Sequence, residues 1–180
     1  MPLNNAQTNA YISLGSNLGD RAGHLLMGIR GMLEAGLEVT RLSQVYETEP
    51  VETFAQPFFL NMVAELKISA AINPVALMQR LLQIENSLGR TRDSVKGPRT
   101  IDLDLLLYGD QTSDSELLTL PHPRFHRRRF VLVPLAELCP GLRHPIVDRT
   151  IRELLQDAPD KSVVKLWDSR YAPTISDQSV

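Results

Sequence analysis

The stretch "FFLNMVAELKIS" at residues 58–69 decides the fold, because its pattern is typical of one long strand with two different faces. In an extended chain, alternate side chains point to the same face. One face then carries Phe59, Asn61, Val63 and Glu65, whereas the other carries Leu60, Met62, Ala64 and Leu66. The stretch therefore predicts a strand with one wholly apolar face and one mixed face.

The elements next to this strand follow from capping residues and apolar spacing. On its C-terminal side, Asn73 and Pro74 suit the N-cap and the first position of a helix, and Gly89 suits its end. The apolar stripe of this helix is Leu77, Leu81, Ile84 and Leu88. On the N-terminal side, residues 37–50 alternate as a second strand does, with a slip in period that indicates a bulge.

Two further strands and one helix complete the pattern. Residues 10–16 and 100–108 are typical of strands, and a helix is expected to begin at Arg21 and to end at Gly36. The order strand, helix, strand, strand, helix, strand is that of the split βαβ, ferredoxin-like arrangement. The sequence therefore predicts an α+β protein, an antiparallel sheet with helices packed on it, both long helices on one face.

The C-terminal part of the chain predicts smaller pieces. Within residues 130–138, Pro134 favours a short helix that starts at the proline, because proline fits the first turn of a helix best. A second short helix is expected within residues 148–156.

Length and charge limit the architecture and the partners. The 180 residues suit a single domain over residues 1–180, with its core at about 10–157 and a peripheral tail at 158–180. The net charge of −2 speaks against a surface built to coat nucleic acid or an anionic membrane. Nothing in the sequence demands a protein partner, so we expect a monomer that binds small molecules.

The cellular location follows from what the sequence lacks. The single cysteine, Cys139, cannot form a disulfide within the chain, which favours a reducing compartment. No apolar run reaches the roughly 18–20 residues of a membrane span. Residues 1–10 lack the basic and apolar regions of a signal peptide, so we expect a cytoplasmic protein.

The stretch "GPRTIDLDLLLYGD", residues 97–110, places Asp102 and Asp104 inside an apolar strand. The two carboxylates share one face, and they repel each other unless a cation lies between them. Mg²⁺ is a natural partner, because it uses one or two carboxylates and fills its other positions with water and phosphate oxygens. Basic side chains flank the pair: Arg90, Arg92, Lys96 and Arg99 before it, and His122, Arg124, Arg127, Arg128 and Arg129 after it. The sequence thus predicts a site for a polyphosphate–metal complex.

Other interpretations of these residues stay open at this point. The two aspartates also suit a solvated strand face, and Phe59 is either a core residue or a ring on which a heterocycle stacks while Asn61 hydrogen-bonds its edge. A metal-dependent nuclease or nucleotidyltransferase would use the same carboxylates and arginines. An RNA-binding module would use an exposed aromatic residue on a similar sheet. The glycine-rich P-loop sequence is missing, so phosphates would bind to a different scaffold.

Four stretches, in this order, resemble the 6-hydroxymethyl-7,8-dihydropterin pyrophosphokinases of folate biosynthesis. They are "YISLGSNLGDR", "YETEP…QPFFLNMV", "GPRTIDLDLLLYG" and "LPHPRFHRRRFVLVPLAEL". The resemblance runs from about Tyr11 to Leu155. It implies a ferredoxin-like enzyme that moves the β,γ-pyrophosphoryl group of ATP onto the pterin hydroxymethyl oxygen, releases AMP and uses two Mg²⁺ ions.

The resemblance also implies roles for single residues. Asp102 and Asp104 match the metal-binding aspartates, the first of which also lies near the pterin. Together with Arg90 and Arg92, which match the catalytic loop at the ATP phosphates, they are the expected catalytic residues. Further residues expected at ATP are Arg99, Leu105, Thr119, His122 and Arg128. Those expected at the pterin are Thr48, Val51, Phe59, Asn61 and Phe130, with the two phenylalanines stacking on the ring.

The chain departs from the family pattern at a few positions. Lys96 stands where some members have a tryptophan before G-P-R, in a loop that is one residue shorter. Glu49 and Pro123 replace a common proline and a common aromatic residue, and Phe59 replaces the tyrosine of some members. These departures concern loop closure and substrate affinity rather than the reaction.

Overall fold

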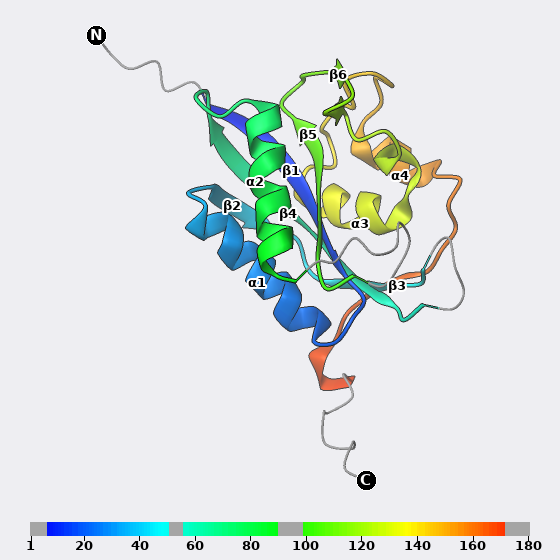
Figure 1. Ribbon diagram of the computed structural model, residues 1–180. Helices are drawn as coiled ribbons and strands as arrows, with labels where there is room; N and C mark the ends of the chain where they lie inside the picture. Colours follow the sequence, from blue (N-terminus) through cyan, green and yellow to red (C-terminus); the bar gives the residue numbers. More distant parts are fainter. Residues whose placement is uncertain (1–6, 51–55, 90–98, 172–180) are drawn as a thin grey trace.

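The computed structural model of the protein describes residues 7–50, 56–89 and 99–171, and its centre is a sheet of six strands (Figure 1). The order of strands is β5 (Asp102–Tyr108), β1 (Gln7–Ser16), β4 (Phe59–Ser69), β3 (Tyr46–Thr48) and β8 (Val164–Leu166). β2 (Glu38–Leu42) pairs with the other end of β4, and the pairings are antiparallel. β6 (Ser113–Asp114) and β7 (Thr119–Leu120) form a separate two-stranded sheet.

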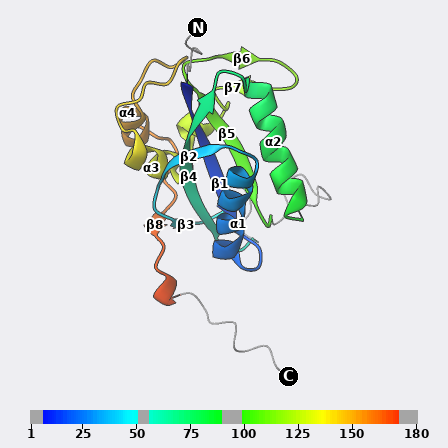
Figure 2. The same ribbon diagram turned by 90° about the vertical axis from the view of Figure 1, so that its left-hand side faces the viewer.

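Helices cover both faces of the large sheet (Figure 2). On one face lie α1 (Arg21–Glu34) and α2 (Pro74–Ser87); on the other lies α3 (Arg129–Leu138), with α4 (Ile151–Gln156) packed against it. The ferredoxin-like fold and the position of both long helices on one face are therefore confirmed. The cover that α3 provides on the second face was not part of the prediction.

The two long helices begin and end where their capping residues predict. The Asp20 carboxylate accepts a hydrogen bond from the Gly23 amide at 2.9 Å, and the chain leaves α1 through Gly36, whose φ is +74°. The Asn73 side chain accepts a hydrogen bond from the Ala76 amide at 2.9 Å, with Pro74 as the first helical residue of α2.

β4 is buried on both faces, with the alternation that its sequence predicts. Leu60, Met62 and Ala64 belong to the hydrophobic cluster beneath α1 and α2. Val63 belongs to a second cluster, which lies between the sheet and α3 and includes Leu132. The mixed face of this strand is therefore the face that α3 covers.

An irregularity in the β1–β5 register changes which residues of β5 face each cluster. Tyr11 pairs with Leu107 and Ile12 pairs with Leu105, so Leu106 is an extra residue. Before it, Leu103 and Leu105 belong to the cluster beneath α1 and α2, whereas Leu106 and Leu107 belong to the cluster beneath α3. Asp102 and Asp104 alternate with these leucines and so lie on the α3 side.

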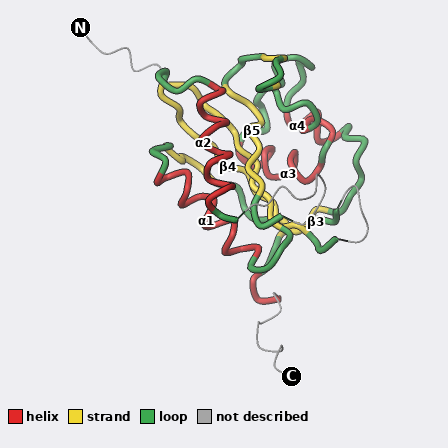
Figure 3. The backbone as a smooth tube through the Cα atoms, in the orientation of Figure 1, coloured by secondary structure: helices red, strands yellow, loops and turns green. Residues whose placement is uncertain are grey.

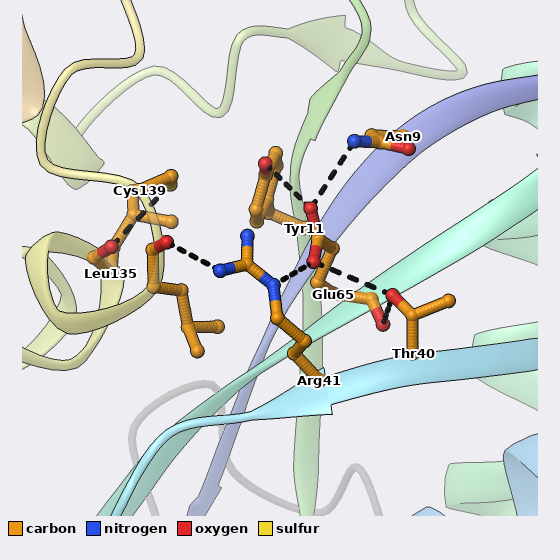
Figure 4. A network of polar contacts seen from close by, with 8 residues as sticks. Asn9, Tyr11, Thr40, Arg41, Glu65, Leu135 and Cys139 are labelled. Carbon is orange, nitrogen blue, oxygen red and sulfur yellow. Dashed lines mark hydrogen bonds and ion pairs between the residues drawn. The ribbon is translucent and has the colours of Figure 1, made fainter.

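The second face also contains a network around one buried carboxylate (Figure 4). Glu65 accepts hydrogen bonds from the Tyr11 hydroxyl at 3.0 Å and from Asn9 Nδ2 at 3.2 Å, and it forms an ion pair with Arg41. The Arg41 guanidinium holds the pKa of Glu65 below its usual range. Because Arg41 Nη1 also donates to the Leu138 carbonyl at 2.8 Å, the network attaches the C-terminal end of α3 to the sheet.

Two predicted boundaries are wrong in detail. Residues 37–50 form two strands, β2 and β3, rather than one, although the predicted bulge is present as a register shift between Val39 and Arg41. The helix α3 begins at Arg129, not at Pro134, which lies inside it. Its residues Val131, Leu132 and Leu135 are buried, and their burial offsets the hydrogen bond that the proline removes.

The tail after α4 contributes to the sheet. Ala158 is fully buried, and β8 pairs with β3 as an edge strand. The first part of the segment that was expected to form a peripheral tail, residues 158–166, therefore packs against the rest of the protein. Among the helices of the described residues, none combines the length and the apolar character that a bilayer crossing requires.

Candidate active site

A row of residues crosses the sheet at one end: Asp102 on β5, Gly15 on β1 and Asn61 on β4 are direct neighbours. Residues opposite each other in antiparallel strands point to the same face, here the α3 side. A Cβ atom at Gly15 would lie 2.9 Å from Asn61 Oδ1 and 3.9 Å from the ring of Phe59. The glycine therefore leaves room between the carboxylate and the amide.

The amide end of this row is fixed by a neighbouring strand. Asn61 Nδ2 donates to Thr48 Oγ1 at 2.7 Å, and both residues are almost fully buried. Thr48 lies opposite Phe59 in the β3–β4 pair, and Phe59 is half-buried. A buried amide held in one orientation presents a defined pattern of donor and acceptor, which suits recognition of a heterocycle edge. The predicted grouping of Thr48, Phe59 and Asn61 is thus present in the structure.

The carboxylate end of the row is held by Arg99. Arg99 Nη1 lies 2.5 Å from Asp102 Oδ2, in an ion pair between half-buried side chains. The backbone of Arg99 is fixed in turn by Asn17. Asn17 Oδ1 accepts a hydrogen bond from the backbone amide of Arg99 at 2.8 Å, and the backbone amide of Asn17 donates one to the Arg99 carbonyl at 3.1 Å. Asn17 is almost fully buried, and its part in holding Arg99 was not predicted.

Asp104 lies two residues after Asp102 on β5, opposite Ser13 of β1, and the environment of its carboxyl group shifts its pKa. Burial, together with the negative charges of Asp102 and Glu85, raises the pKa of Asp104 to about 7, against a smaller opposing effect of Arg99 and Arg128. Glu85, on α2, is buried and accepts a hydrogen bond from the Leu103 amide at 2.6 Å. Sequence reasoning missed Glu85, although its position four residues after Leu81 on the apolar stripe is a usable signal.

His122 faces this acidic pair from the segment between β7 and α3, which runs mostly as loop (Figure 3). Its amide donates to the Leu106 carbonyl at 2.9 Å, which anchors the segment at the bulge of β5. Burial and the positive charges of Arg128 and Arg124 lower the pKa of His122 to about 4, so its ring is neutral at pH 7. Because Nδ1 accepts from the Arg124 amide at 3.4 Å, we infer that the proton lies on Nε2.

Phe130 lies in the first turn of α3, next to Arg128. The Arg128 guanidinium lies 5.6 Å from the centre of the Phe130 ring, within the range of a cation–π contact. Both side chains are half-buried. Since the charges of Arg128 act on both Asp104 and His122, the start of α3 belongs to the same site as the carboxylates.

A cavity of about 320 Å³ adjoins the carboxylates. It lies between α2, β5 and the segment from Ser115 to Pro123, with an apolar side that includes Met78, Leu82 and Leu105. Four of the residues expected at ATP or metal line it, namely Asp104, Leu105, Thr119 and His122. Its volume lies in the range of small-molecule and nucleotide sites.

The remaining predicted residues fall outside what the structure describes. Arg90, Arg92 and Val51 lie outside the described residues, as does Lys96. Of the described residues, none form a group of three or more histidine, cysteine, aspartate or glutamate side chains arranged to hold a metal ion. Any metal at this site would therefore rest on the two aspartates and on ligands from elsewhere.

Comparison with protein families gives one match over most of the chain. A family model described as 7,8-dihydro-6-hydroxymethylpterin-pyrophosphokinase (HPPK) matches residues 11–140.

Curated proteins of similar sequence agree with this match. The 2-amino-4-hydroxy-6-hydroxymethyldihydropteridine pyrophosphokinase of Bacillus subtilis is 43% identical over 159 residues, which cover 88% of this chain and 89% of that protein. The protein of the same name from Haemophilus influenzae is 37% identical over 158 residues, covering 87% and 97% of the two chains. The folic acid synthesis protein fol1 of Schizosaccharomyces pombe is 39% identical over 155 residues, and the match covers only 21% of that longer protein.

Solved structures share the fold. Wild-type Plasmodium falciparum HPPK-DHPS, in a crystal structure with SDX-DHP, superposes with a TM-score of 0.67 at 16% sequence identity. The match covers 86% of this chain and 45% of that chain. At this identity, the comparison supports the fold alone.

Proposed function

The chain belongs to the 7,8-dihydro-6-hydroxymethylpterin-pyrophosphokinase family, and from this we infer that it is a pyrophosphokinase of folate biosynthesis. It transfers the pyrophosphoryl group of ATP to 6-hydroxymethyl-7,8-dihydropterin, which gives the pterin diphosphate and AMP. The pterin oxygen forms a bond to the β-phosphorus, and the bond from this phosphorus to the α,β-bridging oxygen breaks.

The row across the sheet is the observation that supports this assignment best. Adjacent strands are about 5 Å apart, so Asp102 and Asn61 are separated by about 10 Å across Gly15. A bicyclic ring with one short alcohol arm suits this span, with its edge at Asn61 and its hydroxyl group at Asp102. Phe59 and Phe130 offer aromatic faces for stacking on the ring.

The nucleotide is proposed to bind in the adjoining cavity. Its apolar side suits a nucleobase, and its polar side, with Asp104 and His122, suits the phosphates. Neutral His122 donates a hydrogen bond from Nε2, while Arg99 and Arg128 supply positive charge for the phosphate oxygens. Arg90 and Arg92 are proposed to add to this charge.

The described residues fit a magnesium requirement. Burial, together with repulsion from the carboxylates of Asp102 and Glu85, raises the pKa of Asp104 to about 7. A divalent cation bound by Asp102 and Asp104 would relieve this repulsion, and Mg²⁺ typically takes only one or two protein carboxylates. When bound, the metal supplies positive charge that stabilises the transferring pyrophosphoryl group. We propose two such ions, as in the family.

The residues of the chain then act mainly by positioning and charge. Asn61, Thr48 and the two aromatic rings orient the pterin, so that its hydroxyl oxygen is in line with the β-phosphorus. Arg99 and Arg128 stabilise negative charge that develops on the phosphates. Asp102, at the alcohol end of the row, accepts the hydroxyl proton. No covalent intermediate with the enzyme is needed.

Four broader expectations remain part of this proposal. The protein is proposed to act as one domain and as a monomer, without nucleic acid or membrane partners. Its proposed location is the cytoplasm. None of these is needed for the reaction itself.

The products of ATP turnover test the proposed function. We expect AMP and the pterin diphosphate when the protein receives ATP, Mg²⁺ and 6-hydroxymethyl-7,8-dihydropterin together, and no AMP when the pterin is left out. Both products are measured by chromatography with phosphorus detection. Formation of ADP, or release of AMP without pterin, would contradict the assignment.

A further inference from the structure

The segment Ala158–Trp167, which we call the strap, runs from the end of α4 to the edge of the sheet. Ala158 is buried in the cluster beneath α3, and Trp167 packs against the cluster beneath α1 and α2. The strap therefore has fixed positions at both ends, on opposite faces of the sheet.

Near its start, the strap binds the first turn of α3. Asp160 Oδ2 accepts a hydrogen bond from the Arg129 amide at 2.8 Å, and Asp160 Oδ1 accepts one from the Ser162 amide at 2.8 Å. Arg129 Nε donates to the Ser162 carbonyl at 3.3 Å. The N-cap residue of α3, Arg128, makes no side-chain capping bond, so Asp160 supplies the cap from another part of the chain.

The charge of Asp160 suits this position. Burial opposes ionisation, but the hydrogen bonds from the Ser162 and Arg129 amides hold the pKa of Asp160 below its usual range. An ionised carboxylate is also stabilised at the positive N-terminal end of a helix.

Near its end, the strap pairs with β3. Val164 lies opposite Thr48 and Leu166 lies opposite Tyr46, and the Trp167 amide donates to the Val45 carbonyl at 2.9 Å. Thr48 is the residue that fixes the amide of Asn61. The strap thus connects the strand behind Asn61 with the helix turn that carries Phe130.

The two ends of α3 are held in different ways. At the C-terminal end, Glu137 accepts hydrogen bonds from the Gln44 amide at 3.1 Å and from the Tyr46 hydroxyl at 3.0 Å. At the N-terminal end, the first residue of the helix bonds to Asp160. The position of Phe130 relative to Thr48 therefore depends on the strap.

We propose that Asp160 is a positioning residue for the pterin site: it holds the first turn of α3 so that Phe130 lies at the right distance from Asn61 and Thr48. This inference rests on the proposed function. Most residues that line the nucleotide cavity belong to α2, β5 and the segment from Ser115 to Thr119, none of which contributes to these contacts. Of the groups proposed at the nucleotide, Arg128 lies next to the turn that Asp160 holds. Loss of Asp160 should therefore weaken pterin binding more than nucleotide binding.

The test compares three variants of the full chain. Asp160→Ala removes both acceptors, Asp160→Asn keeps one of them, and Asp168→Asn is the matched control. Asp168 lies in the same part of the chain, and its carboxylate forms an ion pair with Arg170 rather than a contact with α3. Calorimetry measures binding of 6-hydroxymethylpterin in the presence of a non-hydrolysable ATP analogue, and binding of the analogue alone.

We expect Asp160→Ala to weaken pterin binding about five- to tenfold, the size of a lost helix cap, with Asp160→Asn in between and Asp168→Asn unchanged. The affinity for the ATP analogue should fall less than the pterin affinity in both Asp160 variants, and it should stay the same in Asp168→Asn. Unchanged pterin affinity in Asp160→Ala, or equal losses for both ligands, would overturn the proposal.

Amide hydrogen exchange gives a second readout that needs no ligand. The Arg129 amide should exchange faster in Asp160→Ala than in the wild type or in Asp168→Asn. If wild-type protein bound no pterin, the proposed function would fail, and exchange would still decide whether Asp160 holds the helix. Equal exchange of the Arg129 amide in all variants would contradict the proposal that Asp160 holds the first turn of α3.

Discussion

At the scale of single residues, Asp104 shows how the site changes the pKa of a carboxyl group. In the folded protein its pKa is raised to about 7, whereas an unperturbed aspartate has a pKa of 3.8. Between pH 3.8 and about pH 7, the folded state binds more protons than the unfolded state. The ionisation of Asp104 therefore lowers the free energy of unfolding as pH rises through this range. Its stabilising contribution is present at low pH and is lost as pH passes through about 7.

Replacement of Asp104 by asparagine should separate stability from activity. In metal-free buffer, the stability of Asp104→Asn relative to wild type should increase from pH 5 to pH 8, because the variant has no carboxylate to ionise. Activity should fall on the order of 100-fold or more, because a proposed metal ligand is lost. Thermal denaturation at the two pH values and the AMP assay measure these effects.

The exposed residue Asp110 provides the control, since Asp110→Asn changes the same charge at the end of β5 outside the site. It should change neither the activity nor the pH trend. An Asp104→Asn protein that is less stable than wild type at pH 8 would show that the carboxylate is a structural group.

Residues of the site differ in how far sequence alone could predict them. Asp102 and Asp104 were predictable because strand alternation is local. Asn17 was not, because its role depends on Arg99, which follows it by 82 positions and meets it only after folding. The apolar stripe indicates that Glu85 is buried, but its partner, the Leu103 amide, is known only from the structure.

At the scale of elements, the glycines of α1 explain how two helices pack on one face. A Cβ atom at Gly31 would lie 2.6 Å from Ile84 Cγ2 of α2, which is too close without movement. A Cβ atom at Gly28 would lie 3.4 Å or more from Ile101 and Leu103, which is ordinary contact. Only Gly31 is therefore required by helix packing.

This difference gives a matched pair of variants on one helix. Gly31→Ala should lower the free energy of unfolding by about 1–3 kcal/mol through overpacking. Gly28→Ala should leave it unchanged or raise it by up to about 1 kcal/mol, because alanine favours the helix. Chemical denaturation measures both, and equal effects of the two variants would refute the packing argument.

Elements with local signals were predictable, and elements defined by distant partners were not. Asp20, Asn73 and Pro74 mark helix starts in the sequence itself. The start of α3 was misjudged because Pro134 is a local signal that burial of apolar neighbours overrides. The three-residue strand β8 lies in a mostly apolar stretch at residues 163–167, but its place in the sheet depends on its pairing with β3, which only the structure shows.

At the scale of the whole molecule, the two faces of the sheet have different roles. The face beneath α1 and α2 is a continuous hydrophobic cluster, whereas the face beneath α3 combines apolar packing with Glu65, Asn61 and the two aspartates. The order of elements along the sequence was sufficient to predict that α1 and α2 cover one face of the sheet. The cavity and the strap arise from contacts among segments far apart in the sequence, and so they needed the structure.

The central claim is that Asp102 and Asp104 hold the divalent cations of the bound nucleotide. The most direct test is calorimetric binding of a non-hydrolysable ATP analogue, with and without Mg²⁺, to wild type and to the Asp102→Asn, Asp104→Asn double variant. The account predicts that Mg²⁺ raises the affinity of the wild type by about tenfold or more, and that the double variant loses this gain. An equal gain from Mg²⁺ in a folded double variant would contradict it.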